Sequence, residues 1–554
     1  MLRSRRFAGF VLCVLLAVAH TWPLALAPGR HSLNYNADAE LNEWIMAWVA
    51  HQLPRDPAHL FDANIFYPAH DTLAFSEPLI VPALMGAPVA WSGASPVFVH
   101  NLILIAGFAL TAFAAFVTIE AWTGSFAAGL LAGSAFAFNT HTLTRLAHIQ
   151  GIHIYGLPLA LLALDRLIVS GSYPSALLLA GAMALMAYTS GYLVVFACVA
   201  IGVAVVMRAP EWMPRARTFL PAMTAAAVVS AIAIAPVYLP YRRVAREQHM
   251  VRSLDIVKEY SATPIGYLAS AGRIHFSTWS GPFFKNDVDS FFPGFTLLVL
   301  TIVGIWLVVK GPPSPGLPSL NPGFGEMRPL RSRSLMLVGI GITGAVLSLG
   351  PATPVYGWLF HVFPPMQGLR AAARFGNLFL LALAMLGGIG LALLLDRTPQ
   401  ARRRLVAAAA VLLVNVEALR APFTFTPFNG IPGIYRLLAE EPGPVVIAEQ
   451  PFFPRWAIFQ NSHYVLASTA HWRPLMNGYS GYTPDSYQQY ADAFWYFPQD
   501  WAIDAMKKAG VTHVVVHLDA FHRDHMEVLP ALEKRRDFEL MAIGPNNMRL
   551  YRMR

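Results

Sequence analysis

The sequence contains few charged residues for its length. Asp, Glu, Lys and Arg together make up 13% of its 554 residues, whereas soluble domains carry about 25%. A soluble protein of this size would lack the polar surface needed to stay dissolved. Apolar residues make up 56% of the chain, and they are gathered in long uncharged runs that end near residue 421. The composition therefore excludes an ordinary soluble protein and favours one that crosses the bilayer many times.

Cysteine is also scarce, as are the short motifs of nucleotide and zinc chemistry. Cys13 and Cys198 lie inside apolar runs and provide no disulfide framework, CxxC pair or zinc spacing. The sequence contains no HExxH, P-loop or GxSxG motif. One GxGxxG match, Gly339–Gly344, lies in an apolar run without a preceding strand, where small residues favour close helix packing. A nucleotide-binding site is therefore not predicted.

The apolar runs predict the membrane topology. A spanning helix needs about 20 mostly apolar residues, because lipid offers no partner for an unpaired backbone group. By this criterion the chain is a mostly α-helical, polytopic membrane protein with about eleven transmembrane helices. The predicted spans are Phe7–Leu26, Pro96–Ile119, Gly124–Phe138, Gly151–Val169, Ala176–Tyr188, Tyr192–Met207, Phe219–Leu239, Phe295–Val309, Leu335–Leu349, Phe375–Leu395 and Leu405–Leu419.

The distribution of Lys and Arg predicts the orientation. Basic clusters alternate with ends that are poor in basic residues, which places the N-terminus inside and the C-terminal region outside. This topology accounts for the net charge of +9 without a nucleic-acid partner. One outer segment, Tyr241–Ser290, breaks the rule and includes Arg242 and Arg243. The first run could be a cleaved signal peptide, but its near-spanning length favours retention. The stretch Gly311–Pro329 is predicted to be a flexible inside linker.

From Pro422 onward, short stretches rich in Val and Ile alternate with helical ones. They predict a small extracytoplasmic α/β domain over residues 422–554, after a membrane domain over 1–421. The predicted strands are Pro444–Ala448, His463–Ala467, Thr512–His517, Phe538–Ile543 and Met548–Arg552. In the aromatic stretch His471–Tyr482, Gly and Asn permit turns that would present Tyr479 and Tyr482. Such faces suit carbohydrate or lipid headgroups, although a loop packed onto the membrane domain is an equally good interpretation.

Carboxylates stand in the first outer segment, residues 28–95, just beyond the first span. Asp38 and Glu40 are expected to line one loop, and Glu77 is a further acid in the same segment. Desolvation at the membrane boundary would raise the pKa of such a carboxyl group and make it a better base. The alternative is that these acids simply populate a solvated loop.

Two groups of basic and polar residues stand at outer ends of predicted spans. Arg145, His148 and Gln150 lie between the third and fourth spans, where they could meet an anionic group or anchor the chain at the interface. Arg370 and Arg374 are four residues apart, and they would share one face if the next helix has already begun. Paired guanidinium groups suit a lipid phosphate, and snorkelling to headgroups is the alternative.

These features resemble the GT-C superfamily of membrane glycosyltransferases. The resemblance rests on the spaced acidic pair Asp38–Glu40 after the first span, a long first outer loop, about eleven spans and an outer α/β tail. It also rests on the stretches Asp62–Pro68, Arg145–Gln150, Arg370–Phe375 and Trp472–Pro484. Large bacterial members of the superfamily look most similar.

The resemblance implies an activity. Such enzymes transfer a sugar from a polyprenyl-phosphate carrier to an acceptor on the outer face, with inversion at the anomeric carbon. Asp38 would be the base and Glu40 would orient it or the acceptor, while Arg370 and Arg374, together with Arg242 and Arg243, would hold the donor phosphate. The resemblance makes Glu77, Arg145, His148 and Gln150 accessory residues, and Tyr479 and Tyr482 the contacts of the acceptor.

The same resemblance places the chain in a bacterial inner membrane, with the C-terminal domain in the periplasm. The partners would be membrane lipids, the lipid-linked sugar, and a glycan, lipid or protein acceptor. No metal ligand is assigned, although some members use a divalent metal. Two other functions remain open: a transporter or flippase, and a non-catalytic scaffold for envelope assembly. Scarce charges within the spans and the lack of an evident inverted repeat speak against a transporter.

Overall fold

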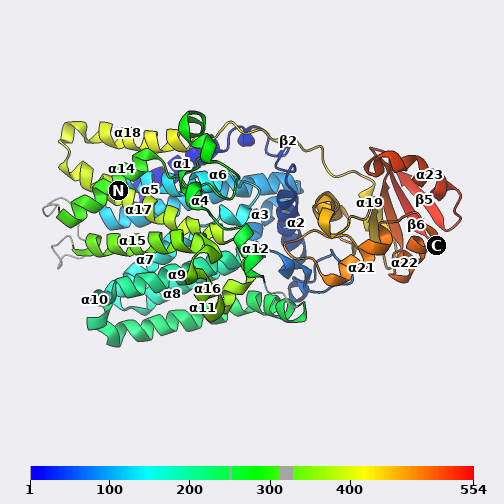
Figure 1. The fold of residues 1–554 in the computed structure, drawn as a ribbon, viewed down its shortest axis with the longest axis horizontal. Helices are drawn as coiled ribbons and strands as arrows, with labels where there is room; N and C mark the ends of the chain where they lie inside the picture. Colours follow the sequence, from blue (N-terminus) through cyan, green and yellow to red (C-terminus); the bar gives the residue numbers. More distant parts are fainter. Residues whose placement is uncertain (1, 249–251, 311–327) are drawn as a thin grey trace. The chain divides into compact units, whose positions relative to one another are not determined.

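The computed structural model describes residues 2–248, 252–310 and 328–554. The predicted inside linker, residues 311–329, lies outside this part of the chain except for its last two residues. The chain forms two compact units. Unit 1 contains Met1–Ala27, Leu102–Pro236 and Val251–Thr424, and unit 2 contains Pro28–Asn101, Val237–Met250 and Phe425–Arg554. Both units are shown in Figure 1 and are described separately.

Unit 1 is built from helices, as the apolar runs predict. Its longer helices are α1 (Leu2–His20), α4 (Pro96–Thr123), α5 (Phe126–Ala137), α7 (Gly156–Ser170), α8 (Tyr173–Ala187), α9 (Gly191–Met207), α11 (Ala216–Glu247), α14 (Phe295–Lys310), α15 (Arg328–Ser348), α16 (Pro354–Val362), α17 (Gly376–Arg397) and α18 (Gln400–Ala418). Short helices α6 (Thr140–Leu143), α10 (Ala209–Trp212), α12 (Leu254–Glu259) and α13 (Arg273–His275) connect them.

Five helical stretches in the described residues are long and apolar enough to cross a membrane. They are Pro96–Thr123, Ile149–Ser170, Ala209–Glu247, Leu330–Ser348 and Ala372–Arg397. Further apolar helices of 10–17 residues accompany them. The chain is therefore a mostly helical, multi-pass membrane protein, as predicted, while the number of about eleven spans stays a prediction.

Helix α17 lies at the centre of unit 1 and packs against α5, α14 and α15 (Figure 1). Its residues are buried along most of its length. Gly390 is required here, because a Cβ atom at this position would lie 2.0 Å from the carbonyl oxygen of Leu300 in α14. Gly304 of α14 faces it equally closely, since its added Cβ would lie 2.7 Å from the Gly390 Cα atom. Paired small residues allow close backbone approach, which is how helices associate in lipid.

A buried ion cluster joins three other elements of unit 1. Asp165 in α7 is 4% exposed, and Arg208, which follows α9, is 1% exposed. The Asp165 carboxylate accepts hydrogen bonds from Arg208 Nη1 at 2.5 Å and from Arg333 Nη2 of α15 at 2.8 Å. Arg208 also pairs with Glu211. The single aspartate therefore balances guanidinium groups from two neighbouring segments.

Unit 2 joins segments that are far apart in the sequence. The short strand β1 (His31–Ser32) pairs antiparallel with β2 (Thr426–Pro427). The backbone N–H of Phe66 donates to the Asn477 carbonyl oxygen at 3.1 Å, and the N–H of Leu475 donates to Asn64 at 2.8 Å. Helix α2 (Ala37–Gln52) packs against both α3 (Ile80–Trp91) and α20 (Ser462–Ala467). Residues 28–101 and the C-terminal region thus share one core.

The remainder of unit 2 is a four-stranded mixed sheet with helices between the strands. The strands are β3 (Ile447–Gln450), β4 (His513–His517), β5 (Phe538–Ile543) and β6 (Met548–Met553), in the order β3-β4-β6-β5. β3 pairs parallel with β4 in the register Ile447↔His513, and the other two pairings are antiparallel. The helices are α19 (Tyr435–Glu440), α21 (Asp485–Phe494), α22 (Asp500–Lys508) and α23 (His525–Glu533).

One predicted strand is wrong. Residues His463–Ala467 belong to helix α20, which starts at Ser462. Four consecutive side chains, from Tyr464 to Ala467, are buried there, so the helix is enclosed on more than one face. A short apolar run of this kind fits a buried helix and a buried strand equally well, and the sequence alone does not separate them.

We expect Asp165→Ala to destabilise the protein by about 3–5 kcal/mol, because Arg208 and Arg333 would be left buried without their counter-charge. The measurement is the melting temperature of the detergent-purified protein. Melting is monitored as the loss of the monodisperse size-exclusion peak on heating. Asp255→Ala removes an exposed aspartate from α12 and should leave the melting temperature unchanged. Equal melting of wild type and Asp165→Ala would contradict a stabilising role for the cluster.

Candidate functional site

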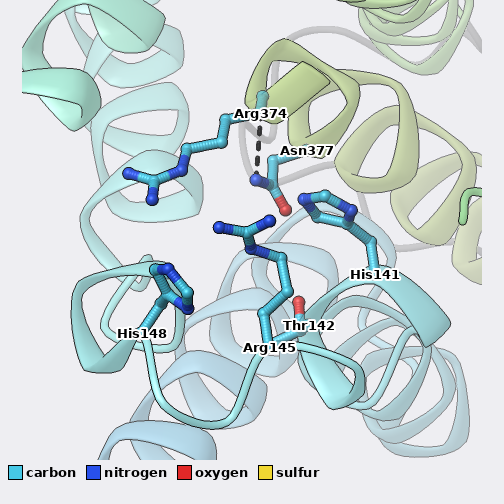
Figure 2. A pocket seen from close by; sticks show the side chains of 7 residues that line it. His141, Thr142, Arg145, His148, Arg374 and Asn377 are labelled. Atoms are coloured by element: carbon cyan, nitrogen blue, oxygen red, sulfur yellow. Dashed lines mark hydrogen bonds between the residues drawn. The ribbon is translucent and has the colours of Figure 1, made fainter. Parts of the chain in front are cut away.

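A pocket in unit 1 gathers several of the predicted basic residues. It is lined by His141, Thr142, Arg145, His148, Gly151, Arg374 and Asn377. Figure 2 shows the side chains of Arg145, His148 and Arg374 arranged around one space, with Arg145 extending toward Asn377. We call this site the arginine pocket. Arg145 and His148 are thus brought together with Arg374, which is distant from them in the sequence.

The first wall of the pocket is the connection between α5 and α7. Asn139 caps the short helix α6: its Oδ1 atom accepts from Thr142 N at 2.9 Å and from Thr142 Oγ1 at 3.1 Å. Asparagine suits this position because its side chain satisfies a free N–H at the start of a helix. The cap turns the chain after α5 and leads it through Arg145 and His148. Gln150 lies in the next turn, Ile149–Gly151, and is buried.

The second wall is the segment that precedes α17. This helix begins only at Gly376, and residues Ala372–Phe375 form a 3₁₀ turn. The prediction that Arg370 and Arg374 share a helical face depended on an earlier start, so it is wrong. The guanidinium of Arg370 lies over the ring of Tyr260, 4.7 Å from its centroid, and that of Arg374 lies over Tyr192 at 4.5 Å. Only Arg374 lines the pocket.

Side chains that sequence reasoning missed hold this wall in place. The Tyr192 hydroxyl accepts hydrogen bonds from the backbone N–H groups of Arg370 at 2.8 Å and Ala371 at 3.0 Å. Asn377 Nδ2 donates to the Arg374 carbonyl oxygen at 3.0 Å. No local signal marks Tyr192, because its partners lie 178 and 179 residues away in the sequence.

Two guanidinium groups give the arginine pocket positive charge. Burial, and then the charges of Arg145 and Arg374, hold the pKa of His141 well below its ordinary value, so this imidazole is neutral at pH 7. Its ring stacks on Phe291, with centroids 4.5 Å apart. None of the described residues that line the pocket is acidic. A guanidinium pair in such surroundings favours an oxyanion such as phosphate.

The predicted carboxylates lie in unit 2 on a helix, so the expectation of a loop is wrong. Asp38 and Glu40 occupy the first turn of α2, where Asn36 Oδ1 caps the helix by accepting from Asp38 N at 2.9 Å. Acidic side chains are favoured there because the helix dipole is positive at its N-terminus. Asp38 Oδ1 accepts a hydrogen bond from the Tyr479 hydroxyl at 2.7 Å. The aromatic stretch therefore contacts the carboxylate directly.

Glu40 and Glu43 form a buried acidic pair in α2. Glu40 is 8% exposed and Glu43 is 1% exposed, and Glu40 accepts a hydrogen bond from the Ser462 hydroxyl. Burial raises the pKa of Glu40 to about 7. Burial and the neighbouring charge of Glu40 raise the pKa of Glu43 well above its ordinary value. Glu43 is not among the predicted site residues, although its spacing of three from Glu40 places both on one helical face.

The other predicted residues of unit 2 take part in contacts there. Arg243 on α11 forms an ion pair with Asp71, with Nη2 at 2.8 Å from Oδ1, and Arg242 beside it is exposed. The Tyr482 hydroxyl donates to the Gln248 carbonyl oxygen at 3.2 Å. Glu77 is half-buried ahead of α3. The charge of Arg243 is thus balanced within unit 2.

The fold and the pocket define the class: a multi-pass helical membrane protein with a cationic pocket. No protein-family profile and no curated protein matches the sequence. Among solved structures, the chain resembles arabinofuranosyltransferase AftD from Mycobacteria, with a TM-score of 0.60 and 14% identity over 100% of this chain and 40% of that one. A second AftD structure, of a mutant, has a TM-score of 0.60 and 16% identity over 99% of this chain and 41% of that one. This chain thus spans about two fifths of the length of AftD.

A weaker similarity extends to ArnT from Cupriavidus metallidurans, with a TM-score of 0.41 and 12% identity over 100% of this chain and 98% of that one. The AftD comparison shows that this chain shares the fold of that glycosyltransferase, which agrees with the predicted resemblance to the GT-C superfamily.

We expect Glu40→Gln to change how stability depends on pH. The pKa of Glu40 rises from its ordinary value of 4.5 to about 7 on folding, so the folded protein holds this proton more tightly than the unfolded chain. The contribution to stability is fully present below the ordinary pKa and is lost as pH rises through about 7. Glutamine does not ionise, so the variant does not lose this stability, which is on the order of 1–3 kcal/mol. Its side-chain oxygen can still accept a hydrogen bond from Ser462.

The measurement is the melting temperature of wild type and Glu40→Gln at several pH values between about 5 and 8. The variant should gain stability relative to wild type as pH rises. Glu440→Gln, which alters an exposed glutamate on α19, should follow wild type throughout. Parallel curves for wild type and Glu40→Gln would show that Glu40 does not titrate in this range.

Proposed function

We propose that this chain is a membrane glycosyltransferase that transfers a sugar from a polyprenyl-phosphate carrier to an acceptor on the outer face of a bacterial inner membrane. The observation that carries the proposal is the arginine pocket: Arg145 and Arg374 converge from two segments, with no acidic residue among the described lining residues. The pocket lies in the unit that holds most of the membrane-crossing helices. A ligand with a phosphate on a membrane-embedded chain suits both properties.

The GT-C fold supports sugar transfer over the other two functions. AftD, which shares the fold, is an arabinofuranosyltransferase. A transporter would need coupling charges within its spans, and the buried charges Asp165, Arg208 and Arg333 neutralise one another with Glu211. We keep the predicted orientation, with the N-terminus inside and unit 2 in the periplasm, and the prediction of about eleven spans.

In the proposed reaction, the arginine pocket acts on the leaving group. The bond between the anomeric carbon and the carrier phosphate oxygen breaks, and the phosphate takes the electron pair. Arg374 and Arg145 stabilise the negative charge that develops on this oxygen. Because guanidinium stays protonated, the pocket assists departure without transferring a proton. Arg370 is assigned a secondary role, because it is not among the residues that line the pocket.

Asp38 is the proposed base. It would take the proton of the acceptor hydroxyl while the acceptor oxygen bonds to the anomeric carbon on the side opposite the phosphate, which inverts the configuration. The hydrogen bond from Tyr479 to Asp38 Oδ1 holds the carboxylate in a fixed orientation. Glu40 would support the base from the same helical turn. The described residues contain no group of three or more His, Cys, Asp or Glu side chains that could hold a metal ion, so no residue is assigned to one.

We expect Asp38→Asn to lower the rate of sugar transfer by about 100-fold to 10,000-fold, the usual contribution of a general base. An asparagine still accepts from Tyr479, so the local structure should survive. The measurement is carrier phosphate released by the purified protein from a panel of polyprenyl-phosphate sugars. Asp56→Asn changes a more exposed acid of unit 2 and should leave the rate unchanged. Full activity of Asp38→Asn would remove Asp38 from the mechanism.

We expect Arg374→Gln to weaken the binding of polyprenyl phosphate by about 10-fold to 100-fold, because a charged hydrogen-bond donor to phosphate is lost. Binding can be measured by titrating the lipid phosphate into protein held in nanodiscs. Arg166→Gln removes an exposed arginine from α7 and serves as the matched control. If Arg374→Gln binds the lipid as tightly as wild type, the arginine pocket is not the phosphate site.

A further inference from the structure

Tyr192, in the first turn of α9, has a hydroxyl group whose acceptor positions are filled within the protein. Its oxygen accepts from two consecutive backbone amides, those of Arg370 at 2.8 Å and Ala371 at 3.0 Å. A hydroxyl oxygen has two lone pairs and one proton to donate. Both acceptor positions of Tyr192 are therefore filled. In the described part of the chain, no group accepts the remaining proton.

A hydroxyl in this state acts only as a donor toward any further group. Accepting two N–H bonds also polarises the O–H bond, which makes it a stronger donor. A ligand that offers another donor gains nothing at this position, whereas an oxyanion gains a hydrogen bond. The hydroxyl of Tyr192 thus favours a ligand with a hydrogen-bond acceptor, and an anionic oxygen forms the strongest bond of this kind.

The ring of Tyr192 also contacts a residue of the arginine pocket. The guanidinium carbon of Arg374 lies 4.5 Å from the centroid of the Tyr192 ring, a distance at which the electron-rich face holds a cation. Tyr192 is half-buried. The ring of Tyr192 holds the guanidinium of Arg374 in position. Its hydroxyl holds the backbone of residues 370–371, which precede Arg374 in the chain. A phosphate bound to this guanidinium therefore lies beside an unused O–H donor.

We propose that Tyr192 is a phosphate-binding residue, whose hydroxyl donates a hydrogen bond to an oxygen of the phosphate that Arg374 holds. This inference rests on the proposed function and adds a residue to it. Tyr192 recognises the anionic oxygen that the carrier phosphate presents before transfer and on release. Inorganic phosphate presents the same chemistry, so the experiment separates the two ligands.

Tyr260 provides a matched control within the same wall. Its ring lies under the Arg370 guanidinium at 4.7 Å, and it is half-buried like Tyr192. In the described residues, its hydroxyl accepts from no backbone amide, in contrast to that of Tyr192. Tyr260→Phe therefore removes a hydroxyl beside an arginine without removing a polarised donor.

The test measures the binding of undecaprenyl phosphate, and separately of inorganic phosphate, to the full chain in nanodiscs. We expect Tyr192→Phe to weaken undecaprenyl phosphate binding by about tenfold or more, and Tyr260→Phe to change it less than about twofold. Unchanged binding by Tyr192→Phe overturns the inference while leaving the proposed function intact. If the wild type binds neither ligand, both the inference and the proposed function are overturned. If Tyr192→Phe weakens the binding of inorganic phosphate alone, Tyr192 binds free phosphate and the assignment to the lipid phosphate is overturned.

A second variant separates donation to a ligand from bracing of the backbone. Replacing Tyr192 with 3-fluorotyrosine makes the phenol a better donor and a poorer acceptor. Binding at least as tight as that of wild type is the expected result. Weakening as large as that of Tyr192→Phe would show that the hydroxyl serves only to accept from Arg370 and Ala371, and would overturn the inference.

Discussion

The arrangement of unit 1 depends on how closely helix α17 can approach its neighbours. Lipid tails are as apolar as leucine, so burial of apolar side chains gives helices little reason to associate in a bilayer. Close contact has to supply the attraction instead, through dispersion between many atoms. Gly304 and Gly390 allow that contact between α14 and α17. Since Arg374 directly precedes α17 and Asn377 lies in its first turn, this packing also fixes one wall of the arginine pocket.

The pocket shows how a membrane protein can concentrate charge without a buried carboxylate. The guanidinium groups of Arg370 and Arg374 are each placed over an aromatic ring. A ring face attracts a cation but leaves its N–H donors available to a ligand, which a tight ion pair with a carboxylate would occupy. The cluster around Asp165 illustrates the opposite case, because there the donors of Arg208 and Arg333 are used by acids. The first arrangement suits binding and the second suits structure.

Sequence patterns predicted the parts of this molecule that depend on local composition. Uncharged runs identified a helical membrane protein, and the clusters around Arg145 and Arg374 contributed to one pocket. The errors occur where a tertiary contact decides. Asp38 and Glu40 belong to a helix that α20 and α3 cover, and His463–Ala467 is helical because it is enclosed in that same core. Tyr192 and Glu43 were missed because their roles come from partners or burial that no local spacing reveals.

Unit 2 is assembled from two long segments separated by most of the membrane helices. The first outer segment contributes α2 with its carboxylates, and the C-terminal region contributes Ser462 and Tyr479, which bond to them. Neither segment carries a complete core, so neither can be exchanged with a relative on its own. Recombination or grafting within such proteins has to move residues 28–101, 237–250 and 425–554 together. Substitutions in this shared core should therefore arise in compensating pairs, which makes unit 2 one evolving element encoded in three separate parts of the gene.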